Sequence, residues 1–108
     1  MNINYHAPFS INDYLKGLIS EKVARMEHNG KPLMEVDVYF ALKDGPESNK
    51  DKELELKVHV PGQVIFAKSY AESFEKAIPD VSEKIRRQLE KYKGKLEPKG
   101  KDKLMDSN

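Results

Sequence analysis

The 108-residue chain contains no cysteine, and this absence excludes disulfide bonds, thiolate metal sites and a cysteine nucleophile. A chain without cysteine fits a reducing compartment. Its opening segment, MNINYHAPFS, lacks the basic stretch and the apolar run of a signal peptide. No apolar run approaches the roughly 20 residues that cross a bilayer. We therefore expect a cytoplasmic protein that has no membrane partner.

Recognisable catalytic and metal-binding motifs are also missing. The three histidines (His6, His28 and His59) do not stand at the spacing of a metal site. The glycines form no phosphate-binding loop, and no serine is set in a nucleophile elbow. The carboxylates show the pattern of surface residues rather than of a buried acid–base pair. We expect no enzyme activity, no metal and no cofactor.

The formal net charge is only +1, although 34% of the residues are charged. A balance this close to neutral argues against nucleic-acid binding by overall charge, but it is compatible with a local basic patch. The chain is 38% hydrophobic and contains long alternating segments, which indicates a folded protein rather than a disordered one. Its length suits one domain.

Three segments alternate between apolar and polar residues with the period of a β-strand, namely residues 1–6, 34–42 and 54–60. The clean alternation of 34–42 and 54–60 predicts antiparallel strands that are covered on one face only. A further strand is expected over residues 64–69. Pro61-Gly62 predicts a tight turn before the last strand. The polar connection 43–52 is interpreted as a mobile hairpin loop.

A first helix is predicted from Ile11 to Met26, where apolar residues recur at helical spacing. Ser10 or Asn12 is the expected N-cap, and Asp13 falls in the first turn, where the helix dipole favours an acid. Asn29-Gly30 supplies the expected stop.

A second helix is predicted up to Leu96, because its apolar residues form one stripe from Phe74 onward. Ser69 with Glu72 reads as a capping box, and Ser73 is the other candidate for the N-cap. Pro79 falls inside the pattern. It predicts either a kink or a helix that starts afresh at this residue.

The predicted order is β-α-β-β-β-α, with no internal repeat. Both helices must bury their apolar stripes against the aliphatic face of the sheet. We therefore expect a two-layer α+β domain over residues 1–96, in which a four-stranded sheet carries two helices packed on one face. Residues 97–108 have no apolar period and are expected to form a disordered polar tail.

The positive charges gather near the C-terminus. Residues 80–103 contain nine lysines and arginines against five acids, a local balance of +4. At about 100° per residue, four cations of the second helix fall within roughly 80° of one another, whereas Arg86 and Lys93 lie outside this row. The four are Lys84, Arg87, Lys91 and Lys95.

The first helix offers Lys16, Lys22 and Arg25 as further cations, and Lys22 falls within its apolar stripe. If the helices lie side by side, these groups and the row on the second helix would border one groove that suits a phosphate backbone. A charged row is also often just a solvated flank, which Glu21, Glu83 and Glu90 would neutralise. The charges alone leave both interpretations open.

The outward phase of the strands carries Tyr39, Phe66 and His59. Such a patch would stack on bases or contact another protein. Isolated exposed aromatic residues are also common on sheets covered on one side.

Several segments together resemble the ribosome hibernation-promoting factor and ribosome-associated translation inhibitor family, also called sigma-factor modulation proteins. The resemblance covers the chain up to about Leu96. It rests on MNINYH at the start, EKVARME at 21–27, HVPG at 59–62, IFA at 65–67, FEKAI at 74–78 and KIRRQLEKYKGKL at 84–96.

The resemblance implies two parallel helices on a four-stranded sheet, reminiscent of double-stranded-RNA-binding domains. It further implies a translation inhibitor that binds the small ribosomal subunit and the whole ribosome, in the channel of messenger and transfer RNA. Basic helix residues would contact ribosomal RNA phosphates. The matching positions are Lys16, Lys22, Arg25, Lys84, Arg87, Lys91, Lys93 and Lys95.

The sequence also departs from the family pattern. Pro79 replaces a usual acidic residue, Glu72-Ser73-Phe74 stands where D-M-Y is typical, and the first helix lacks its usual terminal aromatic residue. The hairpin loop is longer. The chain stops before the C-terminal dimerisation domain of long members, so by analogy we expect a short form that does not by itself bridge two ribosomes. We also expect a monomer off the ribosome. A general structured-RNA module and a protein-interaction domain that uses the open sheet face remain the alternatives.

Overall fold

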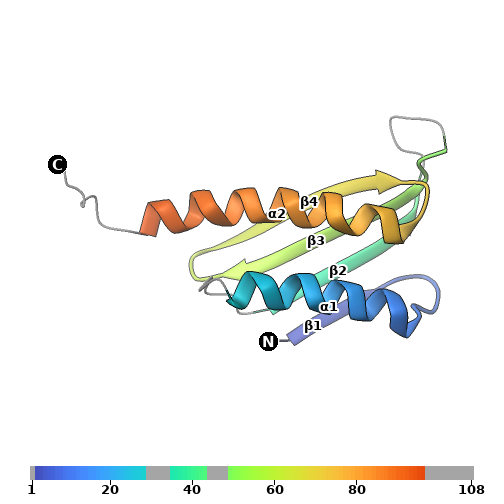
Figure 1. Ribbon diagram of the computed structural model, residues 1–108, viewed down its shortest axis with the longest axis horizontal. Coiled ribbons are helices and arrows are strands. Elements are labelled where there is room, and N and C mark those ends of the chain that lie inside the picture. The colour runs from blue at the N-terminus through green and yellow to red at the C-terminus, as the bar shows by residue number, and fades with distance from the viewer. Residues whose placement is uncertain (1, 29–34, 44–48, 97–108) are drawn as a thin grey trace.

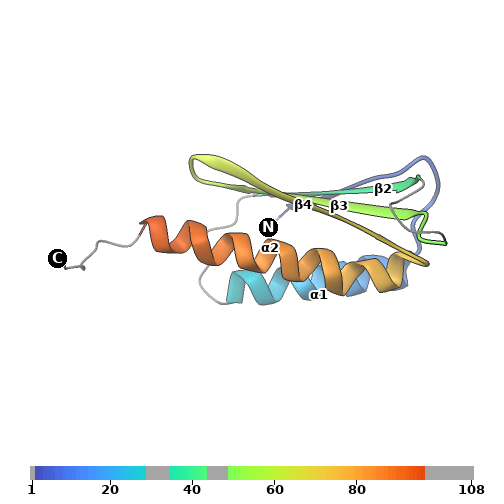
Figure 2. The ribbon, with the colours of Figure 1, turned by 90° about the horizontal axis from the view of Figure 1, so that it is seen from above.

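The computed structural model describes residues 2–28, 35–43 and 49–96, which fold into two layers. The elements are β1 (Asn2–His6), α1 (Asp13–His28), β2 (Glu35–Leu42), β3 (Lys52–Val60), β4 (Gln63–Ala71) and α2 (Phe74–Leu96). Both helices cover the same face of the sheet and lie side by side (Figures 1 and 2). The predicted two-layer α+β fold is confirmed.

The four strands follow one another across the sheet in the order β1-β2-β3-β4. The pairs β2–β3 and β3–β4 are antiparallel, as expected for strands joined by short connections. The pair β1–β2 is parallel because α1 connects the two strands as a crossover. β1 and β4 are therefore the edge strands, and α1 and α2 lie beneath them.

The core lies between the sheet and the helices. Alternate residues of the strands point toward the helices and are almost fully buried, as the sequence pattern predicts. On β2 these are Val36, Val38 and Phe40, and on β3 they are Leu54, Leu56, Val58 and Val60. The helices contribute Ile19 and Val23 from α1 and the stripe Ala77, Ile78, Val81, Ile85 and Leu89 from α2. Neither α1 nor α2 covers the opposite face of the sheet, here called the open face (Figure 2).

Asn12 is the N-cap of α1. Its Oδ1 atom accepts a hydrogen bond of 2.8 Å from the main-chain N–H of Leu15, and its carbonyl oxygen accepts from Lys16. Of the two predicted caps, Asn12 is thus confirmed and Ser10 is wrong. The expected stop at Asn29-Gly30 lies outside the described residues.

The N-cap of α2 is Ser73, whose Oγ atom accepts from the main-chain N–H of Lys76 at 3.1 Å. The predicted cap Ser69 is wrong, because β4 continues its pairing with β3 up to Ala71. Ser69 is buried in that strand and donates a hydrogen bond of 2.6 Å to Asp80 of α2. The hydroxyl of Ser69 therefore links β4 to α2 and is not the N-cap of α2.

Pro79 lies inside an unbroken α2. The alternative of a helix that starts afresh at this residue is therefore wrong, whereas the kink stays a prediction. Pro79 is exposed on the side of α2 that faces α1. Part of the predicted hairpin loop and the whole predicted tail, residues 44–48 and 97–108, lie outside the described residues.

Candidate nucleic-acid interface

The described cations of the predicted row, Lys84, Arg87 and Lys91, are exposed on α2 and are here called the basic flank. The exposed fraction of the side chain is 45% for Lys84 and 67% for Arg87. A buried apolar stripe holds the helix on the sheet, so the spacing of these cations is fixed. Lys93 and Lys95 belong to α2, but their side chains lie outside the described part of the structure.

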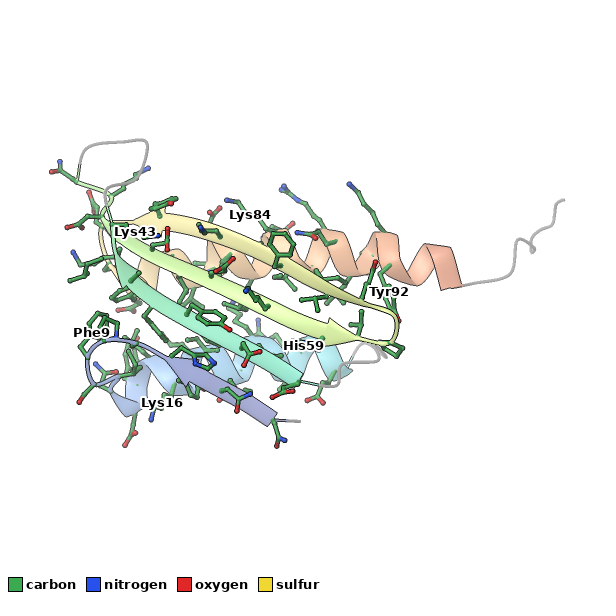
Figure 3. All side chains as sticks on the ribbon, turned by 180° about the vertical axis from the view of Figure 1, so that it is seen from behind. Phe9, Lys16, Lys43, His59, Lys84 and Tyr92 are labelled. Atoms are coloured by element: carbon green, nitrogen blue, oxygen red, sulfur yellow. The ribbon has the colours of Figure 1, made fainter. Side chains whose placement is uncertain are left out.

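The basic flank lies along the outer edge of β4. The Nζ atom of Lys84 donates to the main-chain carbonyl oxygen of Lys68 at 2.8 Å, and Nε2 of Gln88 donates to that of Phe66 at 2.7 Å. Lys91 lines a shallow hollow with Gln63 and Val64. Figure 3 shows the open face of the sheet, with Lys84 at the edge of β4 and α2 behind it.

The cations of α1 lie elsewhere. The Nζ atom of Lys16 lies 5.4 Å from the ring centroid of Tyr5, on the side of β1. Lys22 and Arg25 face α2 instead, across a cleft of about 240 Å³ between the helices. Lys22 is half-buried there, as its place in the apolar stripe predicts.

Arg86, which lies outside the predicted row, borders this inter-helix cleft from α2. Lys84 and Arg86 are about 200° apart on the helix, so they project from opposite sides of α2. The expected single groove that unites the cations of both helices is therefore wrong. Helical spacing alone places Arg86 opposite Lys84, but only the packing of α1 decides that this side becomes a cleft.

Carboxylates partly neutralise these cations, as the alternative interpretation of the row predicts. Glu83 accepts two hydrogen bonds from Arg86, at 2.9 and 2.7 Å, and one from Arg87 at 3.3 Å. These contacts, with Arg86 first, lower the pKa of Glu83 to about 2. Asp80 lies 3.5 Å from Lys84. Exposed ion pairs of this kind contribute little to stability, so a phosphate oxygen can replace the carboxylate at small cost.

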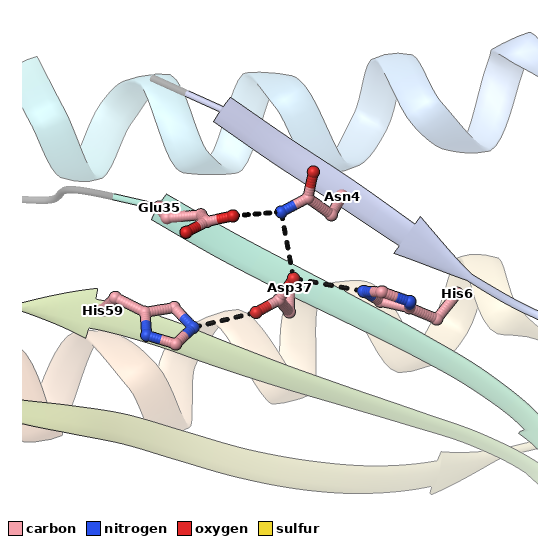
Figure 4. A network of polar contacts seen from close by, with 5 residues as sticks. All are labelled: Asn4, His6, Glu35, Asp37 and His59. Carbon is pink, nitrogen blue, oxygen red and sulfur yellow. Dashed lines mark hydrogen bonds and ion pairs between the residues drawn. The ribbon is translucent and has the colours of Figure 1, made fainter.

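A network of polar side chains occupies the open face, where Asp37 accepts hydrogen bonds from three residues (Figure 4). Its two carboxylate oxygens lie 3.1 Å from Nε2 of His6 and 2.8 Å from Nε2 of His59. The amide of Asn4 adds a third hydrogen bond. The hydrogen bonds of His6 and then of His59 lower the pKa of Asp37 to about 2. The carboxylate is thus ionised and fully engaged at neutral pH.

The aromatic patch predicted on the open face is only partly available. Tyr39 stacks on His6 with ring centroids 4.5 Å apart, and the ammonium of Lys57 lies 5.0 Å from its ring centroid. Its neighbours on β1 and β3 thus engage the ring. Phe66, in contrast, is 58% exposed. The outward phase of both residues is confirmed, but Phe66 offers most of the free aromatic surface.

Two further properties concern the described residues, 2–28, 35–43 and 49–96. In this part of the chain, no group of histidine and carboxylate side chains is arranged to hold a metal ion. Neither α1 nor α2 is long and apolar enough to cross a membrane.

Comparison with known proteins places the chain in a family. A search of curated proteins finds no match. Solved structures that share the fold include the following two. A ribosomal subunit interface protein from Coxiella burnetii is 23% identical with a TM-score of 0.74, covering 87% of this chain and 99% of that one. The Protein Y N-terminal domain from Thermus thermophilus is 19% identical with a TM-score of 0.68, covering 85% and 99%. Over residues 1–97 the sequence matches the family described as sigma 54 modulation protein / S30EA ribosomal protein, and the chain belongs to this family.

Proposed function

We propose that the protein is a non-enzymatic translation inhibitor that binds the small ribosomal subunit, in the channel of messenger and transfer RNA. Membership of a family that includes ribosomal proteins supports a ribosomal partner. So does the likeness to a structure described as a ribosomal subunit interface protein. In this proposal the protein acts in the cytoplasm and is a monomer when it is not bound to the ribosome. Residues 1–96 bind the ribosome without a metal or cofactor.

The observation that carries the proposal is the basic flank on a rigid helix. Lys84, Arg87 and Lys91 rise over about 10 Å along the helix axis. Each can contact a different phosphate group, and each contact releases counterions from the RNA. The buried stripe of α2 fixes the backbone positions of these residues before binding, so only their exposed side chains lose conformational entropy.

Lys16, Lys22 and Arg25 on α1, with Lys93 and Lys95 at the end of α2, complete the proposed contact set. The structure separates the described members into three locations: the β1 side, the inter-helix cleft and the basic flank. A channel lined with RNA on several sides would engage all three. Inhibition would then be steric, because the domain occupies the space that messenger and transfer RNA need.

Sedimentation of the purified protein with ribosomes at two salt concentrations tests the proposal. We expect migration with small subunits and whole ribosomes at low salt, and weaker binding at high salt. Addition of messenger and transfer RNA should displace the protein, which separates channel binding from a general affinity for structured RNA.

The variant Lys84→Ala/Arg87→Ala/Lys91→Ala should lose most of the bound fraction. Its control is Lys76→Ala, because Lys76 is a cation in the first turn of α2 that is as exposed as Arg87 and is paired with Glu72. Free protein at the top of the gradient at low salt would contradict the proposal and would favour a protein-interaction domain that uses the open face.

A further inference from the structure

Phe66 connects two surfaces of the molecule. Its side chain projects from β4 onto the open face and is 58% exposed. Its main-chain carbonyl oxygen accepts the hydrogen bond from Gln88, which lies between Lys84 and Lys91 on α2. The most exposed aromatic ring of the open face therefore stands beside the basic flank.

The surface between Phe66 and the basic flank is continuous at Val64. This residue is 45% exposed and lines two hollows. One hollow lies on the open face with Phe66, and the other lies at the edge of β4 with Lys91. A bound polymer can thus extend over Val64 from the cations of α2 to the ring of Phe66.

The charges differ between the two surfaces. The open-face hollow that contains Phe66 is lined by charged groups of both signs, because Lys57 and His59 share it with Asp37 and Glu55. The basic flank, in contrast, presents three exposed cations on α2 beyond the edge of β4. A nucleotide that uses both surfaces would therefore place its phosphate over α2 and its base over the ring.

We propose that Phe66 is a stacking platform for a base of unpaired RNA, whose phosphates lie on the basic flank. A base within a duplex is covered on both faces by its neighbours, whereas an unpaired base can lie flat on an exposed ring. Tyr39 is less suited to this role, since His6 and Lys57 already contact its ring. The inference rests on the proposed function for its partner, an unpaired segment of ribosomal RNA.

The protein contains no tryptophan, so a single tryptophan introduced at the proposed site can be observed by its fluorescence. Phe66→Trp preserves the stacking surface and introduces one fluorophore at the proposed site. We expect a labelled single-stranded RNA of about a dozen nucleotides to bind this variant with near wild-type affinity and to quench its fluorescence. The same strand annealed to its complement should quench it much less.

Phe66→Ala should lower the affinity for the single strand by about 5- to 100-fold, measured by fluorescence anisotropy. The matched control is Leu42→Ala, which removes an apolar side chain of similar exposure, 60%, two strands away on β2. Thermal unfolding of each variant checks that the fold is intact. Unchanged affinity in Phe66→Ala, or RNA binding to Phe66→Trp without quenching, would overturn the proposal.

Sedimentation with ribosomes separates this inference from the proposed function. If the wild-type protein binds ribosomes, and Phe66→Ala binds single-stranded RNA with the same affinity as wild type, the stacking proposal is wrong and the proposed function stands. If the wild-type protein stacks on single strands through Phe66 but never binds ribosomes, the proposed function falls together with the ribosomal origin of the RNA, and the stacking platform itself stands. If Phe66→Ala loses ribosome binding with no loss of RNA affinity, Phe66 contacts a protein and the stacking proposal is overturned.

Discussion

The ammonium of Lys84 lies 2.8 Å from the main-chain carbonyl oxygen of Lys68. One cation of the basic flank is therefore also a structural link between α2 and β4. Its contribution to the fold has to be separated from any contribution to binding.

Lys84→Ala should lower the free energy of unfolding by about 0.5 to 1 kcal/mol, because one partly exposed hydrogen bond is lost and water can replace the donor. Urea unfolding followed by circular dichroism measures this difference. Lys91→Ala is the control, since Lys91 makes no hydrogen bond or ion pair among the described residues; it should leave stability unchanged. Both variants should weaken ribosome binding to a similar degree. Equal stability of the two variants would contradict the structural role of Lys84.

Arg87→Ala should weaken ribosome binding more than Arg86→Ala. The two arginines share the carboxylate of Glu83, but Arg86 borders the inter-helix cleft and Arg87 stands on the basic flank. Loss of one phosphate contact should also reduce the slope of log affinity against log salt concentration by about 0.7 to 0.9. Binding measured at several salt concentrations gives both quantities. A larger effect of Arg86→Ala would move the main RNA contact to the cleft.

Acid unfolding should depend on Asp37. Its pKa in the folded protein is about 2, below the ordinary value of 3.8. A carboxyl group with a lowered pKa stabilises the fold fully above its unfolded pKa, and this contribution disappears as pH falls toward the folded pKa. The loss should therefore occur between about pH 4 and pH 2.

Asp37→Asn should be less stable than wild type at neutral pH and should lose less stability between pH 4 and pH 2. Denaturant unfolding at a series of pH values makes the comparison. His6→Ala and His59→Ala each remove one contact to the carboxylate. In each variant the acid-induced loss of unfolding free energy should therefore begin at a somewhat higher pH than in wild type. If wild type and Asp37→Asn lost the same unfolding free energy between pH 4 and pH 2, Asp37 would not be the group responsible for this pH dependence.

The N-caps give a prediction on stability alone. Ser73→Ala and Asn12→Ala should each lower the free energy of unfolding by about 1 kcal/mol, because each leaves a main-chain N–H of the first turn without its acceptor. Ser73→Asp should retain most of the stability. Ser10→Ala should have almost no effect, since Ser10 lies outside α1. A large loss in Ser10→Ala would indicate that α1 begins earlier than the structure shows.

The sequence predicts the layers well because each strand buries every second residue. The alternation over Val36, Val38 and Phe40 gives both the strand and the face that it buries. The N-caps were harder to assign. Ser69 and Glu72 satisfy a capping box within the local sequence, but β4 pairs with β3 past Ser69, and this long-range pairing outweighs the local signal.

The functional surfaces are harder to predict from the sequence, because they too depend on contacts between elements that are distant in the chain. The parallel register of β1 and β2 puts His6 opposite Tyr39, so a residue 33 positions away covers the ring. Arg86 acquires its cleft only because α1 packs against that side of α2. Spacing within one element predicts which side a residue is on. It does not predict which neighbour occupies that side.

The contacts of Lys84 and Gln88 with β4 also affect how the protein behaves when it is concentrated. An edge strand presents unpaired main-chain groups with which a strand of another chain can pair. The side chains of α2 occupy the acceptors of Phe66 and Lys68, so these two carbonyl oxygens are less available for such pairing. This part of β4 is therefore protected against edge-to-edge association at high protein concentration.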